Sequence, residues 1–167
     1  MTPNIKRRIH AFRNAMVLAA DIRSYECFHL PRWREELNGF PGGSCELASN
    51  FLAQYLKDCD PMLQPQIILM CTTEDFREEK GSSIRSHVIV KLDTWYIDLT
   101  LNQFPEYSSR VCIEEKGMLA TLIRDIRKFD GTVKTKEITL QAGILDGSEL
   151  YQWLKDTASE LLNEKVS

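Results

Sequence analysis

The sequence lacks the features that mark membrane and nucleic-acid-binding proteins. It has no apolar run that approaches the roughly 20 residues needed to cross a bilayer. The apolar stretch from Ala15 to Ala20 is too short for a secretory signal, and Asp21 follows it where a small-residue cleavage site would stand. The formal net charge is only −3, too small to attract a polyanion in bulk. We therefore expect no membrane and no nucleic acid among the partners.

Paired cysteine spacing is also absent. The five cysteines form no Cys-x-x-Cys pair and are an odd number; they are Cys27, Cys45, Cys59, Cys71 and Cys112. Cys27 and His29 lie close in sequence, but their spacing is not that of zinc ligands. We therefore expect no metal ion and no other cofactor. Scattered reduced thiols fit a cytoplasmic protein best, although a protein exported without a cleaved signal peptide would look the same.

What is present fits one folded domain. The chain has 167 residues, 43% of them hydrophobic, which is enough for a single core. Apolar residues at helical spacing predict a helix over about the first 20 residues. We expect its basic face, which includes Arg8 and Arg13, to be solvated. A second helix should follow the turn-forming cluster at 38–43 and end before Pro61.

The rest of the chain alternates between strand and helix patterns. It predicts a strand at 66–71, a polar loop at 72–86, a β-hairpin at 87–100, a helix at 117–129, a strand at 132–140 and a closing helix capped by Ser148. This order favours the α+β class, with helices packed on a mostly antiparallel sheet. We divide the single domain, 1–167, into a helical segment (1–38), a core (39–104) and a helix-strand-helix segment (105–167).

The stretch "PGGSC" at 41–45 has the features of a nucleophile site. It places Cys45 at the start of a helix, where unpaired backbone N–H groups and the macrodipole favour a thiolate. Ser44 can cap that helix, and Gly42 and Gly43 leave the sulfur uncovered. A lone cysteine is more often a small buried hydrophobe, so this pattern alone leaves both interpretations open.

The hairpin supplies two partners for Cys45. With Asp93 and Thr94 as turn residues, Leu92 pairs with Trp95, and His87 lies diagonal to Asp98 on one face. A slip of one residue would mix this face with the apolar one, so the pattern favours the register. His87 and Asp98 could each be an ordinary strand-end residue. Together with Cys45 they predict a triad in which Asp orients His and His holds the thiolate.

The combination "GGSCELAS" followed by "HVIVKLDTWYIDLT" resembles the papain-like superfamily, in particular its transglutaminase-like branch. The stretch around Cys45 is also similar to that of arylamine N-acetyltransferases, which use the same triad. The likeness covers about residues 40–104 and implies a papain-like core whose nucleophile helix packs on the sheet. It departs from papain-type peptidases at Gly39, where those enzymes carry an oxyanion-binding glutamine.

The resemblance implies a Cys45–His87–Asp98 hydrolase or acyltransferase that acts on a protein or peptide amide through a thioester. Peptide hydrolysis and glutamine deamidation of the bacterial effector type are the reactions we favour. Beside the backbone N–H of Cys45, candidates for oxyanion or substrate binding are Ser44, Gln103 and Asn38. The alternative is a catalytically lapsed scaffold that binds a protein partner through exposed aromatic residues; those considered are Phe28, Trp33 and Trp153.

Overall fold

The computed structural model describes residues 1–21, 33–138 and 147–164. Its described strands are β1 (Gln66–Cys71), β2 (Ser86–Leu92), β3 (Trp95–Asp98), β4 (Cys112–Glu114) and β5 (Thr132–Lys136). They form one sheet in the order β4-β3-β2-β1-β5, and every neighbouring pair is antiparallel. The expected α+β class with a mostly antiparallel sheet is therefore confirmed.

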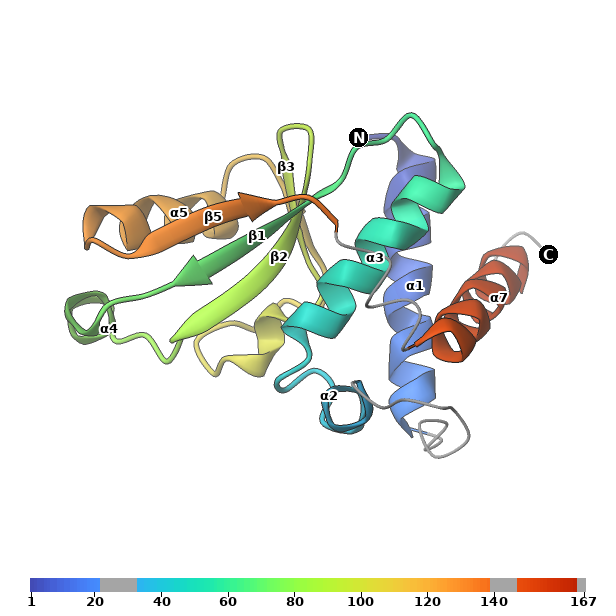
Figure 1. The fold of residues 1–167 in the computed structure, drawn as a ribbon, viewed down its shortest axis with the longest axis horizontal. Helices are drawn as coiled ribbons and strands as arrows, with labels where there is room; N and C mark the ends of the chain where they lie inside the picture. The colour runs from blue at the N-terminus through green and yellow to red at the C-terminus, as the bar shows by residue number, and fades with distance from the viewer. Residues whose placement is uncertain (22–32, 139–146, 165–167) are drawn as a thin grey trace.

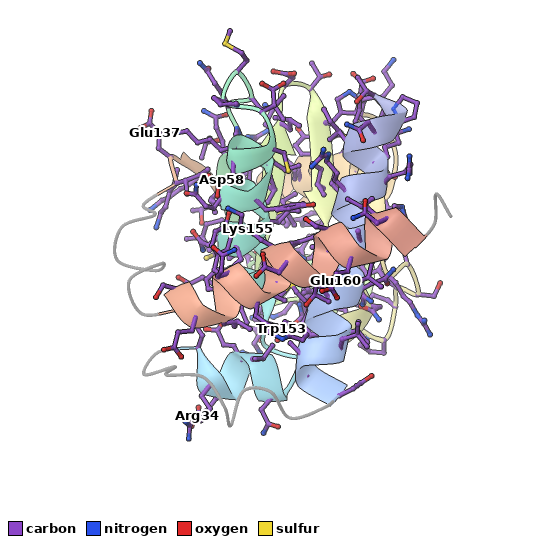
Figure 2. The ribbon with its side chains drawn as sticks, turned by 90° about the vertical axis from the view of Figure 1, so that its right-hand side faces the viewer. Arg34, Asp58, Glu137, Trp153, Lys155 and Glu160 are labelled. Atoms are coloured by element: carbon purple, nitrogen blue, oxygen red, sulfur yellow. The ribbon has the colours of Figure 1, made fainter. Side chains whose placement is uncertain are left out.

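Helices cover both faces of this sheet (Figure 1). The described helices are α1 (Pro3–Asp21), α2 (Arg34–Asn38), α3 (Cys45–Cys59), α4 (Glu74–Lys80), α5 (Met118–Lys128) and α7 (Ser148–Glu164), with a 3-10 turn, η2, at Leu101–Gln103. Helices α1, α3 and α7 gather on one side of the sheet, whereas α5 lies on the other. Figure 2 shows α7 crossing over α1 and α3, so the two ends of the chain share one layer.

Strand β2 separates the two hydrophobic cores because it is buried on both faces. Val88, Val90 and Leu92 belong to the core under α1, α3 and α7. Ile89, which points the other way, belongs to the core under α5 together with Leu122. This period-2 alternation fixes the hairpin register.

The pairing of β2 with β3 is the one that the sequence predicts. Leu92 lies opposite Trp95, and Val90 lies opposite Ile97. Asp93 begins the turn with φ of 54°, the left-handed conformation that a tight hairpin requires.

The prediction of a polar loop over 72–86 is wrong, because α4 lies within it. The hydroxyl of Thr73 accepts a hydrogen bond from the Phe76 N–H at 3.2 Å and so caps the helix start. Gly81 ends the helix in the left-handed conformation. Phe76 is the one apolar residue of this short helix and is buried, which anchors it to the core under α5.

Two further predictions need adjustment. Strand β5 ends at Lys136, and residues 139 and 140 of the expected strand lie outside the described residues. Helix α7 includes Ser148 as its first residue, so Ser148 is not the cap that we expected; the carbonyl of Gly147, one residue earlier, accepts the first helical bond, from the Tyr151 N–H at 2.8 Å. Among the aromatic residues considered for partner binding, Trp33 is 1% exposed and packs edge-on against Phe51, so it offers no docking surface. Phe28 lies outside the described residues, and Trp153 is half-buried on α7 (Figure 2).

Candidate functional site

The first pair of the expected triad comes together at the ends of β2 and β3. Nε2 of His87 lies 2.6 Å from Oδ2 of Asp98, and both side chains are fully buried. The other carboxylate oxygen of Asp98 accepts the backbone N–H of Thr100 at 2.9 Å. Because both carboxylate oxygens are engaged, the carboxylate plane is fixed, and with it the orientation of the imidazole.

The second nitrogen of the His87 ring is left unpaired. Nδ1 is buried and has no hydrogen-bond partner in the described structure. The ring of Phe104 stands edge-on to the imidazole, with ring centroids 5.0 Å apart, and helps to shield it from water. An unpaired buried ring nitrogen is costly in a protein interior, which makes His87 a candidate for a functional residue.

The side chain of Cys45 interacts with the imidazole of His87. Cys45 is the first residue of α3 and is partly exposed. Burial alone would lower the pKa of His87, but the charge and hydrogen bond of Asp98, together with the nearby Cys45 side chain, outweigh it and raise that pKa to about 9. Nδ1 itself makes no hydrogen bond to Cys45 within the described residues; such bonds are often long in catalytic sites without substrate.

The helix that bears Cys45 is capped differently from the prediction. The Ser44 hydroxyl makes no capping bond; it donates to the backbone carbonyls of Glu36 and Gly42. The carboxylate of Glu36 instead accepts the N–H of Leu47 at 3.1 Å. A carboxylate is the stronger acceptor and complements the positive end of the helix dipole, which explains why it replaces the serine. The prediction of Ser44 as an oxyanion donor is also wrong, because Ser44 is fully buried.

The other two candidate oxyanion donors lie in different places. Asn38 ends α2 and is exposed, and the structure does not bring it into the hydrogen-bonded network around His87. Gln103 does join that network. Its Oε1 accepts the Gly43 N–H at 3.1 Å, and its Nε2 donates to Oγ1 of Thr100 at 3.2 Å. Gln103 therefore lies between the loop before Cys45 and the turn after Asp98.

Sequence reasoning missed Arg13, which we expected on a solvated face. Arg13 is only 5% exposed. Its Nε donates to the Leu99 carbonyl at 2.9 Å, its Nη2 donates to Oδ1 of Asn102 at 3.3 Å, and its guanidinium lies 5.2 Å from the centre of the Phe40 ring. Burial is the main cause that lowers its pKa, against the opposing charge of Asp98. The sequence did contain a sign of this burial. Arg13 lies four residues after Ile9 and three residues before Met16, so all three share one face of the helix.

A small cavity lies on the α3 face of the sheet. Its volume is about 210 Å³, and its walls are Glu46, Asn50, Ile67, Leu69, Val88, Lys136 and Glu137. Glu46 follows Cys45 in the chain and Val88 follows His87. The cavity lies on the α3 face of the sheet, because Ile67 and Val88 belong to the core of that face. Neither Cys45 nor His87 is among its walls.

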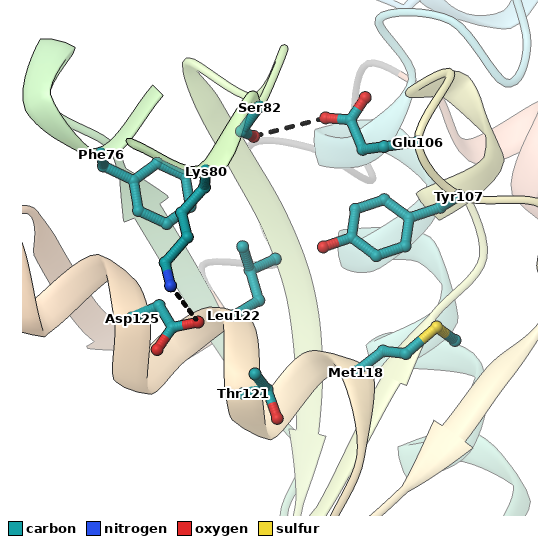
Figure 3. Close-up of a pocket in the computed structure, with 9 residues that line it drawn as sticks. All are labelled: Phe76, Lys80, Ser82, Glu106, Tyr107, Met118, Thr121, Leu122 and Asp125. Carbon is teal, nitrogen blue, oxygen red and sulfur yellow. Dashed lines mark hydrogen bonds and ion pairs between the residues drawn. The ribbon is translucent and has the colours of Figure 1, made fainter. Parts of the chain in front are cut away.

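A larger cavity of about 420 Å³ lies between α4, α5 and the loop around Tyr107 (Figure 3). Its charged side chains already have partners. Nζ of Lys80 lies 3.8 Å from Oδ2 of Asp125, and the carboxylate of Glu106 accepts a hydrogen bond from the Ser82 hydroxyl at 3.3 Å. These charged side chains of the cavity are therefore paired with each other or with Ser82 and do not indicate a ligand site. The Cys45–His87 pair remains the candidate site.

Over 1–21, 33–138 and 147–164, no three His, Cys, Asp or Glu side chains are grouped to hold a metal ion. Cys27 and His29 lie outside these ranges. None of the described helices has the length and apolar character to span a bilayer.

Comparison with known proteins yields relatives without a known activity. No family model matches the chain, and no solved structure matches it. Two curated proteins of Escherichia coli, from strain UTI89 and strain K12, are each described as "Uncharacterized protein YuaU". Each is 35% identical over 116 residues, which is 68% of this chain and 49% of the relative. The chain thus spans about half the length of these relatives, and its function must be argued from the site.

Proposed function

We propose that this chain is a cysteine-dependent hydrolase or acyltransferase that acts on a protein or peptide amide through a Cys45–His87–Asp98 triad. One observation carries the proposal. The buried His87–Asp98 pair leaves the second imidazole nitrogen without a partner, while the side chain of Cys45, at the start of a helix, acts on the same ring. This arrangement contains a nucleophile, a base and a residue that orients the base.

The reaction follows from these positions. Nδ1 of His87 takes the proton from the Cys45 thiol, and the thiolate sulfur attacks the amide carbonyl carbon. His87 then returns that proton to the departing nitrogen, so that ammonia or an amine leaves and a thioester remains on Cys45. Water or a second amine, deprotonated by His87, attacks the thioester and releases Cys45 as a thiol. Asp98 holds the imidazole and stabilises its charged form throughout.

The backbone N–H of Cys45 supports the tetrahedral intermediate. As the first residue of α3, Cys45 has an N–H that finds no acceptor within the helix, and the helix dipole adds to its effect on an oxyanion. The compact core favours a protein or peptide amide as the substrate, either a peptide bond or a glutamine side chain. The four described cysteines are free thiols, which fits a reducing compartment such as the cytoplasm.

A first experiment tests whether the nucleophile exists. The alkylation rate of each cysteine by iodoacetamide is measured between pH 4 and 9 by peptide mass spectrometry. We expect Cys45 to react fast below pH 7, whereas Cys71, an exposed thiol, should react slowly there. Burial and the nearby Glu114 raise the pKa of Cys112 to about 12, so Cys112 is the inert control. Slow reaction of Cys45 at neutral pH would contradict the proposal.

A second experiment separates the reactions. A panel of glutamine-containing proteins and peptides is incubated with the chain and with its Cys45→Ala variant. Ammonia release without new amino termini indicates deamidation, whereas new amino termini indicate peptide hydrolysis. We expect one of the two, and we expect Cys45→Ala to abolish it. A partner that binds equally well to both chains, with neither product formed, would favour the lapsed-scaffold alternative.

A further inference from the structure

The triad comes from two stretches of chain that are far apart in sequence. Cys45 follows a loop that starts after α2, whereas Asp98 precedes the turn that leads into η2. A nucleophile and its base must be held within a fraction of an ångström for efficient transfer, so the relation between these stretches decides reactivity. The Gln103 side chain bonds to both of them.

We propose that Gln103 is a positioning residue, which holds the loop before Cys45 against the turn after Asp98 and thereby places the thiol at His87. This inference rests on the proposed function. It assigns Gln103 a role other than the oxyanion donor that the sequence suggested.

The orientation of the Gln103 amide is determined by its neighbours. The Gly43 N–H is a donor only, so the atom that faces it at 3.1 Å must be the amide oxygen. The amide nitrogen then faces Oγ1 of Thr100 at 3.2 Å and donates to it. Because the oxygen of the Thr100 hydroxyl accepts this bond, its proton is free to point towards Oδ1 of Asp98, 3.4 Å away.

A continuous chain of bonds results. It runs from Gly43 through Gln103 and Thr100 to Asp98, and from Asp98 to Nε2 of His87 at 2.6 Å. Gly43 has φ of +68°, a conformation that glycine adopts without strain, so the direction of its N–H is set by the loop itself. A Gln103 amide that swung away to meet a substrate oxyanion would break this chain at both ends.

Two substitutions distinguish positioning from oxyanion binding. Gln103→Ala removes both bonds. Gln103→Glu keeps an acceptor for the Gly43 N–H, and the Thr100 hydroxyl can rotate to donate to it, but a carboxylate cannot donate to an oxyanion. Gln152→Ala is the matched control, because its amide also makes a side-chain bond, to Asp156 at 2.9 Å, on the distant helix α7.

The measurement is the rate at which Cys45 is alkylated by iodoacetamide at pH 6. In this reaction the thiolate sulfur forms a bond to carbon and iodide leaves, so no oxyanion develops. We expect Gln103→Ala to slow it about tenfold, roughly the effect of one lost hydrogen bond. Gln103→Glu should retain most of the rate, and Gln152→Ala all of it. Thermal unfolding of each variant checks that the fold is retained.

Each other result has a definite meaning. An unchanged alkylation rate in Gln103→Ala overturns the inference, and loss of amide turnover in that same variant would restore the oxyanion role. Equal losses in Gln103→Glu and Gln103→Ala would also overturn it. If Cys45 of the unsubstituted chain is itself slow, the proposed function fails and the inference falls with it; that rate is measured first, so the two failures are distinguishable.

Discussion

Helix α3 carries a cysteine at each of its ends, and the two differ in their neighbours. Cys45 begins the helix beside His87, whereas Cys59 ends it and its sulfur accepts a hydrogen bond from Nη1 of Arg8 at 3.2 Å. Both cysteines are partly buried free thiols. The helix dipole favours a thiolate at the first position and disfavours it at the last.

The comparison shows that a positive neighbour alone does not make a nucleophile site. Arginine does not lose its proton in proteins, so Arg8 can attract a thiolate but cannot accept the proton of a thiol. Tyr55 near Cys59 offers no base either, because burial, reinforced by Cys59, raises the pKa of its phenol to about 12. His87 can take up and return a proton, and Asp98 holds it ready to do so. Of the two ends of α3, only the end at Cys45 has a neighbour, His87, that can both carry a positive charge and accept a proton.

The largest expected effect is on stability as pH changes. The pKa of His87 is raised from 6.5 to about 9 in the folded chain, so between these values the folded state binds more protons than the unfolded state. This contribution is fully present below pH 6.5 and is lost as pH rises through 9; its size is at most about 3 kcal/mol. Denaturant unfolding between pH 6 and 8.5 measures it, in a Cys45→Ala background so that no proton lost from Cys45 offsets the proton held by His87. In the same background His87→Gln should abolish this decline, whereas Arg8→Leu at the other end of α3 should keep it.

Next in size is the effect of His87→Ala on the reactivity of Cys45. Cys45 should be alkylated at pH 6 about 100-fold more slowly, because no base is left to accept the proton of its thiol. Cys59 is the internal control in the same sample and should keep its rate. If the two cysteines slowed together, a general change of the fold would explain the loss, and the pairing of Cys45 with His87 would be refuted.

Asp98→Asn should have an effect of similar size, up to about 100-fold at pH 6. The Thr100 N–H would still require an acceptor, so the new amide oxygen faces Thr100 and the amide nitrogen faces Nε2 of His87. Nε2 then becomes an acceptor, the ring proton moves to Nδ1, and the imidazole can no longer take the proton of Cys45. Asp58→Asn, which removes the ion pair with Lys155 near the Cys59 end (Figure 2), should leave Cys45 unchanged.

Local patterns account for what the sequence predicts correctly. The alternation of β2 and β3 determines their register, and the register places His87 beside Asp98 without any knowledge of the rest of the fold. Likewise, the glycines and the apolar stripe that follows them are enough to place Cys45 at the start of a helix.

The missed residues depend on contacts between distant segments. Glu36 replaces Ser44 as the cap of α3 only because α2 folds beside the helix start. Arg13 belongs to the site only because α1 packs against the turn after Asp98. The amide of Gln103 looks like a free donor in the sequence, and its two bonds emerge only in the assembled fold. Patterns of 2 and 3.6 residues carry no information about such contacts.

The smallest expected effect is at the other end of α3. Arg8→Leu removes the positive charge beside Cys59, and the alkylation of Cys59 at pH 8 should slow only about twofold, because a partly exposed charge is screened by water and salt. Repeating the measurement at 1 M NaCl should reduce the difference further. A tenfold decrease in the alkylation rate of Cys59 would mean that a positive charge alone can activate a thiol in this protein. The contrast between an arginine and a histidine neighbour would then be contradicted. A small loss there, beside the large one in His87→Ala, would assign the reactivity of Cys45 to proton transfer.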